Sequence, residues 1–218
     1  MGHEAHLSAA LPLVGAFLLA SLVLAATPGP GVAYIVARTL AQGRRAGLAS
    51  VAGVAVGNLG NAVGASVGLT ALLAVSSLAF TVVKFAGAAY LVWLGIQALR
   101  SPAASAAGVA FQAPQVGRIF RDGAMVALLN PKTALFFAAF LPQFMVPGVS
   151  TWAQSVAYGV AFVLIAACTD TAYVLAAGWA TPAVSGVKGG AAIGRWATAT
   201  VLIALGVFTA VSGSRSAR

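Results

Sequence analysis

The sequence predicts an all-α integral membrane protein with six transmembrane helices. Of its 218 residues, 61% are hydrophobic and only 7% are charged, whereas soluble domains carry roughly 25% charged residues. Apolar runs of about 20 residues recur, which is the length that spans lipid as a helix. Lys84, Lys132 and Asp170 each stand alone inside such a run. Because an ionised group at mid-bilayer costs at least ~2.5 kcal/mol and usually faces a polar path or a ligand, these residues are the first candidates for function.

Six apolar runs define the expected helices. The first, Leu7 to Ala26, is followed after a Pro-Gly break by a short helix from Gly31 to Ala41. The residues before it include no Lys or Arg, so it lacks the basic region of a secretory signal peptide and we expect it to be retained as a span. The other five spans are expected at residues 46–75, 78–99, 123–146, 152–179 and 196–213.

The positions of Lys and Arg predict the orientation of these spans. The segments after the second and fourth spans carry none, and positive loops favour the cytoplasm. We therefore expect a multi-pass protein of the bacterial inner membrane with both termini in the periplasm, where Arg215 and Arg218 would be discordant. The segments after the first, third and fifth spans hold Arg38, Arg44, Arg45, Arg100, Arg118, Arg121, Lys188 and Arg195.

Residues 1–218 are expected to form one transmembrane domain of two related halves, 7–100 and 118–213. The Ala-, Pro- and Gly-rich stretch 101–117 is typical of a cytoplasmic linker. Each half contains an apolar helix after a proline, PGVAYIVARTLAQ from Pro30 and PKTALFFAAFLPQ from Pro131. Halves of three spans would insert in opposite orientations, and inverted repeats with paired broken helices are typical of transporters.

The segment Thr27-Pro28-Gly29-Pro30-Gly31 is the strongest local feature. Its two prolines remove amide donors and its two glycines permit turns, so a helix cannot continue smoothly through it. In lipid such a break is tolerated only inside protein or beside water. The break therefore either lines a substrate path or forms a simple turn before an interfacial helix that carries Arg38.

The segment Asn130-Pro131-Lys132 is its counterpart in the second half. Asn130 is suited to cap the helix that Pro131 begins. Lys132 then lies about ten residues into its span, ~15 Å deep at the helical rise. A helix N-terminus beside an ammonium favours a carboxylate ligand. The alternative is a lysine that extends along a tilted helix toward the cytoplasm.

Lys84 and Asp170 are the other two ionisable residues within spans. Lys84 lies nearer the outer end of its span, where its ammonium can reach the interface, so functional and structural interpretations are both open. Asp170 lies well inside its span, where a buried carboxyl can carry a proton, pair with a lysine or hold a substrate ammonium. A purely structural ion pair with Lys84 or Lys132 is the alternative.

The third feature is a stripe of glycines on one face of the second span, beside Asn58 and Asn61. The spacing lets another backbone approach closely, and the two amides are placed to bond across helices or to a ligand. The stripe consists of Gly53, Gly57, Gly60, Gly64 and Gly68.

Other function classes find little support in the sequence. The single cysteine, Cys168, rules out an intramolecular disulfide or a cysteine-based metal site. No phosphate loop, metal-ligand cluster or nucleophile–base pair occurs, so we expect no enzyme, metal or cofactor. The net charge of +9 would suggest nucleic acid in a soluble module, but the arginines lie between apolar runs and no such module is left over.

Four segments together resemble the lysine exporter (LysE/RhtB) family, and within it the homoserine/threonine-type exporters. They are TPGPGVAYIVARTLAQGRRAG, KFAGAAYLVWLGIQALR, LLNPKTALFFAAFLPQF and the pair Thr169-Asp170. The resemblance implies a six-span inner-membrane protein that expels amino acids or close derivatives, driven by the proton gradient. It also implies that Lys84, Asn130, Pro131, Lys132 and Asp170 occupy the family's recurring positions. Asn61 departs from the pattern, since many relatives have His there, which puts any role of that His in doubt for this chain.

We therefore expect a secondary transporter that exports small amino acids, threonine- or homoserine-like or basic, by alternating access. In this hypothesis Lys132 and the helix from Pro131 hold the substrate carboxylate. Asp170 holds the ammonium or shuttles a proton, and Lys84 competes with substrate for Asp170. The Pro28–Gly31 break adds backbone polar groups. The expected partners are the amino acid, protons and lipid, homo-oligomerisation is left open, and the alternative is a passive channel or a structural membrane subunit.

Overall fold

A computed structural model describes residues 2–68, 77–100, 115–146, 149–185 and 190–211 of the chain. These residues form helices and turns, and no strand occurs among them. A π-helical stretch, Phe136–Phe140, and a 3-10 turn, Leu141–Phe144, continue from the helix that begins at Pro131. The α-helices are α1 (Gly2–Ala26), α2 (Pro30–Gln42), α3 (Arg44–Ser66), α5 (Ser77–Arg100), α6 (Val116–Leu128), α7 (Pro131–Leu135), α8 (Thr151–Ser185) and α9 (Gly190–Val211).

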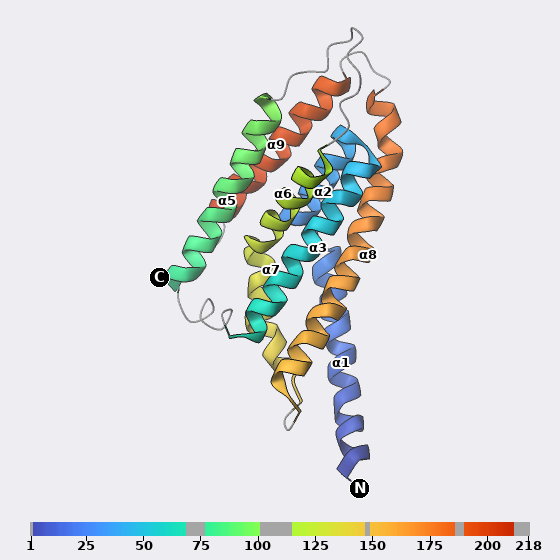
Figure 1. The fold of residues 1–218 in the computed structure, drawn as a ribbon, viewed down its shortest axis with the longest axis vertical. Helices are drawn as coiled ribbons and strands as arrows, with labels where there is room; N and C mark the ends of the chain where they lie inside the picture. Colours follow the sequence, from blue (N-terminus) through green and yellow to red (C-terminus); the bar gives the residue numbers. More distant parts are fainter. Residues whose placement is uncertain (1, 69–76, 101–114, 147–148, 186–189, 212–218) are drawn as a thin grey trace.

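The long helices run side by side along the longest axis of the molecule (Figure 1). Helices α5 and α9 pack together along one side of the bundle, and α8 runs along the other. Helix α3 packs against both α6 and α8, and the short helix α2 contacts α3, α8, α9 and α6. The interior between these helices therefore surrounds the two places where the chain breaks its helices, after α1 and after α6.

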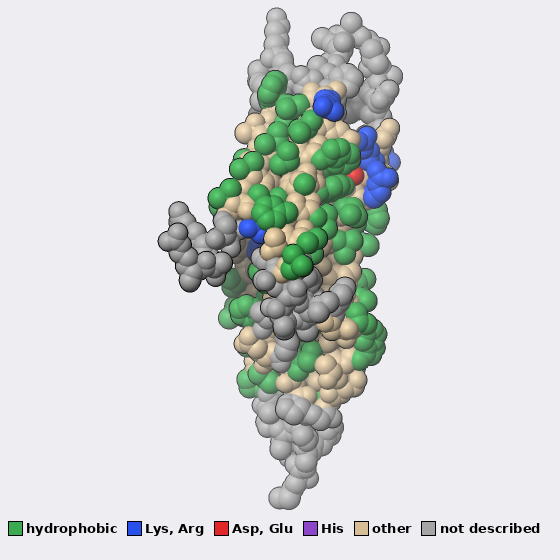
Figure 2. Space-filling view, turned by 90° about the vertical axis from the view of Figure 1, so that its left-hand side faces the viewer, with side chains coloured by type: hydrophobic (Ala, Val, Ile, Leu, Met, Phe, Trp, Pro, Cys, Tyr) green, Lys and Arg blue, Asp and Glu red, His purple; other side chains and the backbone are tan. Residues whose placement is uncertain are grey.

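Several helices have the length and composition of membrane spans. Within the described residues, three helices can each cross a bilayer, Arg44–Ser66, Thr81–Arg100 and Thr151–Trp179, and the bent pair of α1 and α2 adds a fourth. Large apolar side chains face outward, such as Leu19 and Leu164, which are 64% and 62% exposed. Figure 2 shows hydrophobic side chains over much of one face and most basic side chains toward one end. An apolar outer surface of this kind fits lipid, so the fold is that of an all-α membrane protein.

Some expected boundaries were wrong. Helix α3 ends at Ser66, and the chain turns at Gly68 with a φ of +78°, whereas the second span was expected to continue to Val75. Helix α6 begins at Val116, so the last residues of the expected linker 101–117 are helical. Other predictions fall outside the described residues, namely those on 69–76, 101–114, Lys188, Arg215 and Arg218.

The glycine stripe of α3 packs against α6, as expected for a close helix contact. A Cβ added at Gly53 would collide with the carbonyl oxygen of Phe120, and one at Gly57 would collide with that of Ala124. Gly64 has open space around it, and Gly68 is the turn residue that follows the helix. Only the first part of the stripe therefore serves helix packing.

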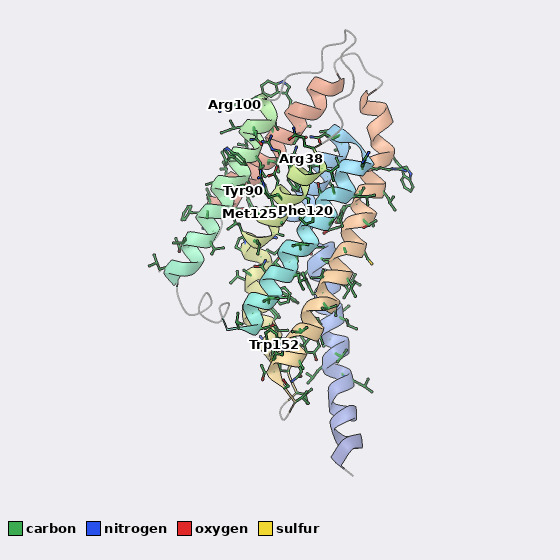
Figure 3. The ribbon with its side chains drawn as sticks, viewed as in Figure 1. Arg38, Tyr90, Arg100, Phe120, Met125 and Trp152 are labelled. Carbon is green, nitrogen blue, oxygen red and sulfur yellow. The ribbon has the colours of Figure 1, made fainter. Side chains whose placement is uncertain are left out.

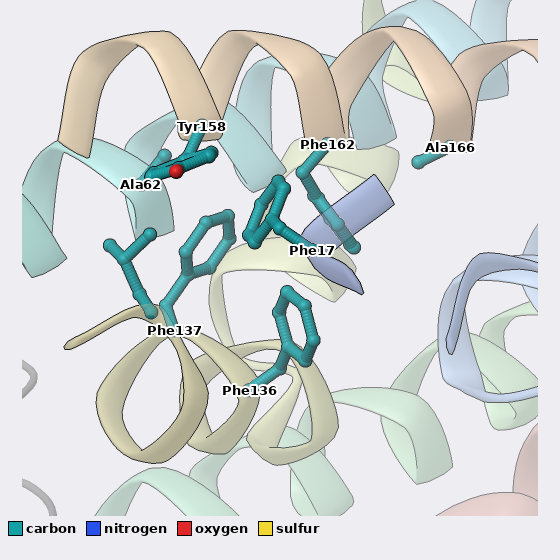
Figure 4. Close-up of a cluster of buried hydrophobic side chains, with 8 residues drawn as sticks. Phe17, Ala62, Phe136, Phe137, Tyr158, Phe162 and Ala166 are labelled. Atoms are coloured by element: carbon teal, nitrogen blue, oxygen red, sulfur yellow. The ribbon is translucent and has the colours of Figure 1, made fainter. Parts of the chain in front are cut away.

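A cluster of aromatic side chains lies between α1, α8 and the π-helical stretch (Figure 4). Phe17 of α1 lies 4.4 Å from Tyr158 of α8 and 6.0 Å from Phe136, measured between ring centroids. Phe162 of α8 packs edge-on against Phe137. Aromatic pairs at these separations are favourable beyond the area that they bury. The cluster holds α1 and α8 against the π-helical stretch.

Candidate functional site

The break between α1 and α2 deprives carbonyl oxygens of their usual helical donors four residues later. Pro28 and Pro30 lack the N–H groups that would bond the oxygens of Leu24 and Ala26 one turn earlier. The Lys132 ammonium donates to Leu24 O at 2.8 Å and to Thr27 O at 2.5 Å. The Tyr173 hydroxyl of α8 donates to Ala26 O at 2.8 Å. Side chains from other helices therefore supply the donors that these carbonyl oxygens lack.

The break between α6 and α7 positions Lys132. Asn130 caps α7, because its side-chain oxygen accepts a hydrogen bond of 3.1 Å from the Lys132 amide, and Pro131 is the first helical residue. Both features confirm the predicted cap. The Lys132 side chain then crosses Gly29, where an added Cβ would lie 3.3 Å from its Cδ. Lys132 therefore connects the two breaks.

Asp170 lies in a small polar cavity at this junction. The cavity has a volume of about 40 Å³, room for roughly two or three waters, and its lining includes Thr27, Asn58, Lys132 and Asp170. The Asp170 side chain is only 5% exposed. No described residue hydrogen-bonds its carboxylate, although the Lys132 ammonium is close enough to act on it electrostatically. A buried carboxylate without such a bond is unusual in a folded protein.

A larger cavity lies on the other side of Lys132. Its volume is about 330 Å³, which falls in the range of small-molecule sites. Lys84 lines it together with Pro28, Pro30 and Thr209. Lys84 is 6% exposed and its ammonium lies 5.2 Å from the centre of the Phe85 ring. The two cavities share Gly29, Asn130 and Lys132 as lining residues, so they are adjacent parts of one site.

The structure brings most of the predicted site residues together. Asn61 is the exception, because it lines neither cavity and instead donates a hydrogen bond of 2.8 Å to the carbonyl oxygen of Ala127 on α6. Asn58, one turn earlier on α3, lines the smaller cavity. The predicted site residues that line one cavity or both are Thr27, Pro28, Gly29, Pro30, Lys84, Asn130, Pro131, Lys132 and Asp170.

The structure contains a second buried carboxylate that the sequence did not predict. Asp122 of α6 is 0% exposed, and its Oδ2 lies 3.3 Å from a guanidinium nitrogen of Arg38 on α2. The Tyr90 hydroxyl of α5 donates to Oδ1 of Asp122 at 3.2 Å. Asp122 stands between Arg121 and Gly123 in the sequence and looks like a surface charge there. Acidic residues are rare in this chain, with only three in all, and this rarity is the sequence feature that could have marked Asp122 as a candidate.

Comparison with known proteins identifies the family. The family model described as "LysE type translocator" matches residues 22–213, which include both helix breaks and both cavities. The chain belongs to the LysE-type translocator family. It is therefore a membrane translocator and not an enzyme, and the resemblance noted in the sequence is confirmed.

Curated relatives of this LysE-type translocator are named as efflux proteins or as membrane proteins. The homoserine/homoserine lactone efflux protein of Salmonella typhimurium is 38% identical over 158 residues, covering 72% of this chain and 77% of the relative. An uncharacterized membrane protein of Vibrio cholerae is 35% identical over the same shares of both chains. An uncharacterized membrane protein of Pseudomonas aeruginosa is 33% identical over 61% of this chain and 63% of the relative. No solved structure gives a significant match.

Proposed function

We propose that this LysE-type translocator exports small zwitterionic amino acids, homoserine- or threonine-like, across the bacterial inner membrane by proton-coupled alternating access. The observation that carries the proposal is the buried Asp170 carboxylate, which no described residue hydrogen-bonds and which lies where two broken helices meet. A buried carboxylate without a hydrogen bond is costly, and a substrate ammonium would supply the missing bond. The relative from Salmonella typhimurium, named for efflux of homoserine and its lactone, supports this substrate class.

The two cavities suggest how such a substrate lies. The cavity beside Asp170 is too small for a whole amino acid, so the substrate body occupies the larger cavity and its ammonium reaches Asp170 past Lys132. The Lys132 ammonium and the N-terminus of α7 then face the carboxylate. The cation that interacts electrostatically with Asp170 is Lys132 and not Lys84. We therefore assign to Lys132, in place of Lys84, the role of competing with the substrate ammonium for Asp170.

The charge of the larger cavity favours neutral over basic side chains. Its described lining includes two ammonium groups, Lys84 and Lys132, and no carboxylate. A substrate with a cationic side chain would meet like charge there, whereas a hydroxyl or a lactone carbonyl can accept a hydrogen bond from Lys84 or Thr209. We therefore favour homoserine- and threonine-like substrates over the basic amino acids that the sequence left open.

Two inverted halves, 7–100 and 118–213, fit this mechanism. In each half a broken helix precedes two further helices, and the counterparts pack on one another, α3 against α8 and α5 against α9. A site between such halves becomes open to one side and then to the other as the halves rock. Arginines at one end, including Arg100 and Arg118, support a cytoplasmic assignment for that end and periplasmic termini.

Transport into proteoliposomes under an imposed pH gradient tests the proposal. We expect Asp170→Asn to lower homoserine transport by roughly 100-fold, since loss of a buried charge partner costs about 3 kcal/mol, and Lys132→Ala to lower it as well. Cys168→Ala is the matched control, because Cys168 lies two residues away and is exposed. Wild-type rates and pH dependence in Asp170→Asn and Lys132→Ala would refute the assignment, and flux that ignores the gradient would indicate a passive channel.

A further inference from the structure

The ion pair between Arg38 and the buried Asp122 lies outside the two cavities and has no part in the proposed substrate contacts. It joins α2 to α6 and, through the hydroxyl of Tyr90, also to α5. We propose that this pair is the gate that closes the path from the substrate site to the arginine-rich end of the molecule. The proposal rests on the proposed function for the direction of transport.

The position of the pair along α2 and α6 supports a gate. Helix α2 starts at Pro30, beside the site, and Arg38 follows about two turns later, ~12 Å along the axis. Helix α6 ends beside Asn130, and Asp122 precedes that end by about the same distance. Figure 3 shows Arg38 and Tyr90 between the level of Arg100 and the middle of the bundle. A solute that leaves the cavities between α2 and α6 toward this end meets the pair.

The hydrogen bonding between Arg38 and Asp122 is weak enough for a gate that opens and closes. One guanidinium nitrogen approaches Asp122 at 3.3 Å, and the buried Nε of Arg38 finds no partner among the described residues. The geometry is therefore not the bidentate one that gives the strongest carboxylate pairs. The ring of Tyr34 lies 5.3 Å below the guanidinium and the Arg38 side chain is 15% exposed, so the guanidinium can move to water without crossing the core.

The opposite side of the site is closed by different chemistry. The aromatic cluster of Phe17, Phe136, Phe137, Tyr158 and Phe162 lies there, and Phe162 also lines the smaller cavity. Hydrophobic side chains close that side by packing and the ion pair closes the arginine-rich side by charge. Alternating access requires that the two closures are not open together, and closures of different chemistry can be weakened separately by substitution.

Thiol labelling tests the gate without measuring transport. In a Cys168→Ala background, Asn58→Cys places a reporter in the smaller cavity, and a membrane-impermeant thiol reagent is added to one face of sealed vesicles at a time. We expect Asp122→Asn to raise the labelling rate from the arginine-rich face by about ten-fold or more, since closed carriers populate the open state at roughly 10% or less. Labelling from the other face should fall.

Three further variants separate a gate from a general packing role. Tyr90→Phe removes one hydroxyl and should raise the labelling rate from the arginine-rich face by a smaller factor. This variant also tests the gate if Asp122→Asn does not fold. The exchanged pair, Arg38→Asp with Asp122→Arg, should restore slow labelling. Arg121→Gln, next to Asp122 but exposed, should leave the rate unchanged.

The proposal is overturned if folded Asp122→Asn and Tyr90→Phe label from the arginine-rich face at the control rate, or if labelling rises equally from both faces. Because the readout is accessibility, a protein that labels as expected and yet moves no homoserine would contradict the proposed substrate and leave the gate standing.

Discussion

Lys132 is the residue on which most of the site depends, because its ammonium serves two neighbours. It donates to the carbonyl oxygen of Leu24, whose usual donor one turn later is replaced by Pro28, and to that of Thr27. It also acts electrostatically on Asp170. An ammonium at the C-terminal end of a helix is favourable. In the proposed mechanism, a substrate ammonium that reaches Asp170 releases Lys132 toward the substrate carboxylate.

Homoserine and its lactone can distinguish the proposed ammonium contact with Asp170 from the proposed carboxylate contact with Lys132. Both compounds carry the ammonium, and only homoserine carries a free carboxylate. We predict that Lys132→Ala lowers homoserine transport about ten-fold more than lactone transport, since a hydrogen bond to a charged group contributes about 1.5 kcal/mol or more. Asp170→Asn should lower both alike. Competition assays in proteoliposomes give the two ratios, and an equal effect of Lys132→Ala on both compounds would show that Lys132 does not bind the carboxylate.

For single residues, the sequence predicted those features that depend only on neighbouring residues in the chain. Asn130 caps the helix that Pro131 begins because both residue types favour those positions whatever surrounds them. The Arg38–Asp122 pair could not be predicted in this way, because its partners lie 84 residues apart and each stands among residues that fit a charged membrane boundary. Asn61 was expected on the substrate path, and the rotation of α3 instead directs it to α6.

The contact between α3 and α6 is the tightest feature at the level of elements. Glycines let the backbones meet directly along the first half of the stripe, where the carbonyl oxygens of Phe120 and Ala124 occupy the space of absent side chains. Helix α6 ends at the site, so this contact fixes the height of Asn130 and Lys132 relative to α3. Rigid support of this kind is what a site of precise geometry requires.

A pair of glycine substitutions on one helix face tests this contact. Gly57→Ala should lower the free energy of unfolding by about 1–3 kcal/mol, as overpacking does, because the new Cβ would meet the Ala124 carbonyl oxygen and the Ala127 methyl group. Gly64→Ala, two turns further on in open space, should be neutral or stabilising by up to about 1 kcal/mol. Thermal unfolding in detergent measures both, and equal stability of the two variants would contradict the close packing.

The apolar composition predicted the positions of the helices better than the residues at which they end. The apolar runs gave the cores of α1, α5, α8 and α9, since burial in lipid favours a helix wherever the run is long enough. The end of α3 at Ser66 follows from the left-handed conformation of Gly68, which an uncharged run does not reveal. The π-helical stretch Phe136–Phe140 packs against Phe17 and Phe162, which are distant in the sequence, and no local sequence pattern predicts it.

For the whole molecule, export through the proposed gate requires that the arginine-rich end faces the cytoplasm. Arg44, Arg45 and Arg118 are exposed at that end, and Trp152 lies toward the other (Figure 3). We predict that an N-terminal tag on intact cells is cleaved by external protease, whereas a tag inserted between residues 101 and 114 is cleaved only after the membrane is opened. The reverse pattern would invert the direction of transport and would place the Arg38–Asp122 pair at the periplasmic end.

The central claim is that Asp170 binds the substrate ammonium, and thermal unfolding of the purified protein with and without homoserine tests it most directly. A ligand at one hundred times its Kd stabilises the folded state by about 2.7 kcal/mol. We predict that homoserine at this concentration raises the Tm of the wild-type protein and of Cys168→Ala by the same amount and raises the Tm of Asp170→Asn far less, since a roughly 100-fold weaker affinity leaves only about 0.4 kcal/mol of stabilisation. An Asp170→Asn protein stabilised by homoserine as strongly as the wild type would contradict the account.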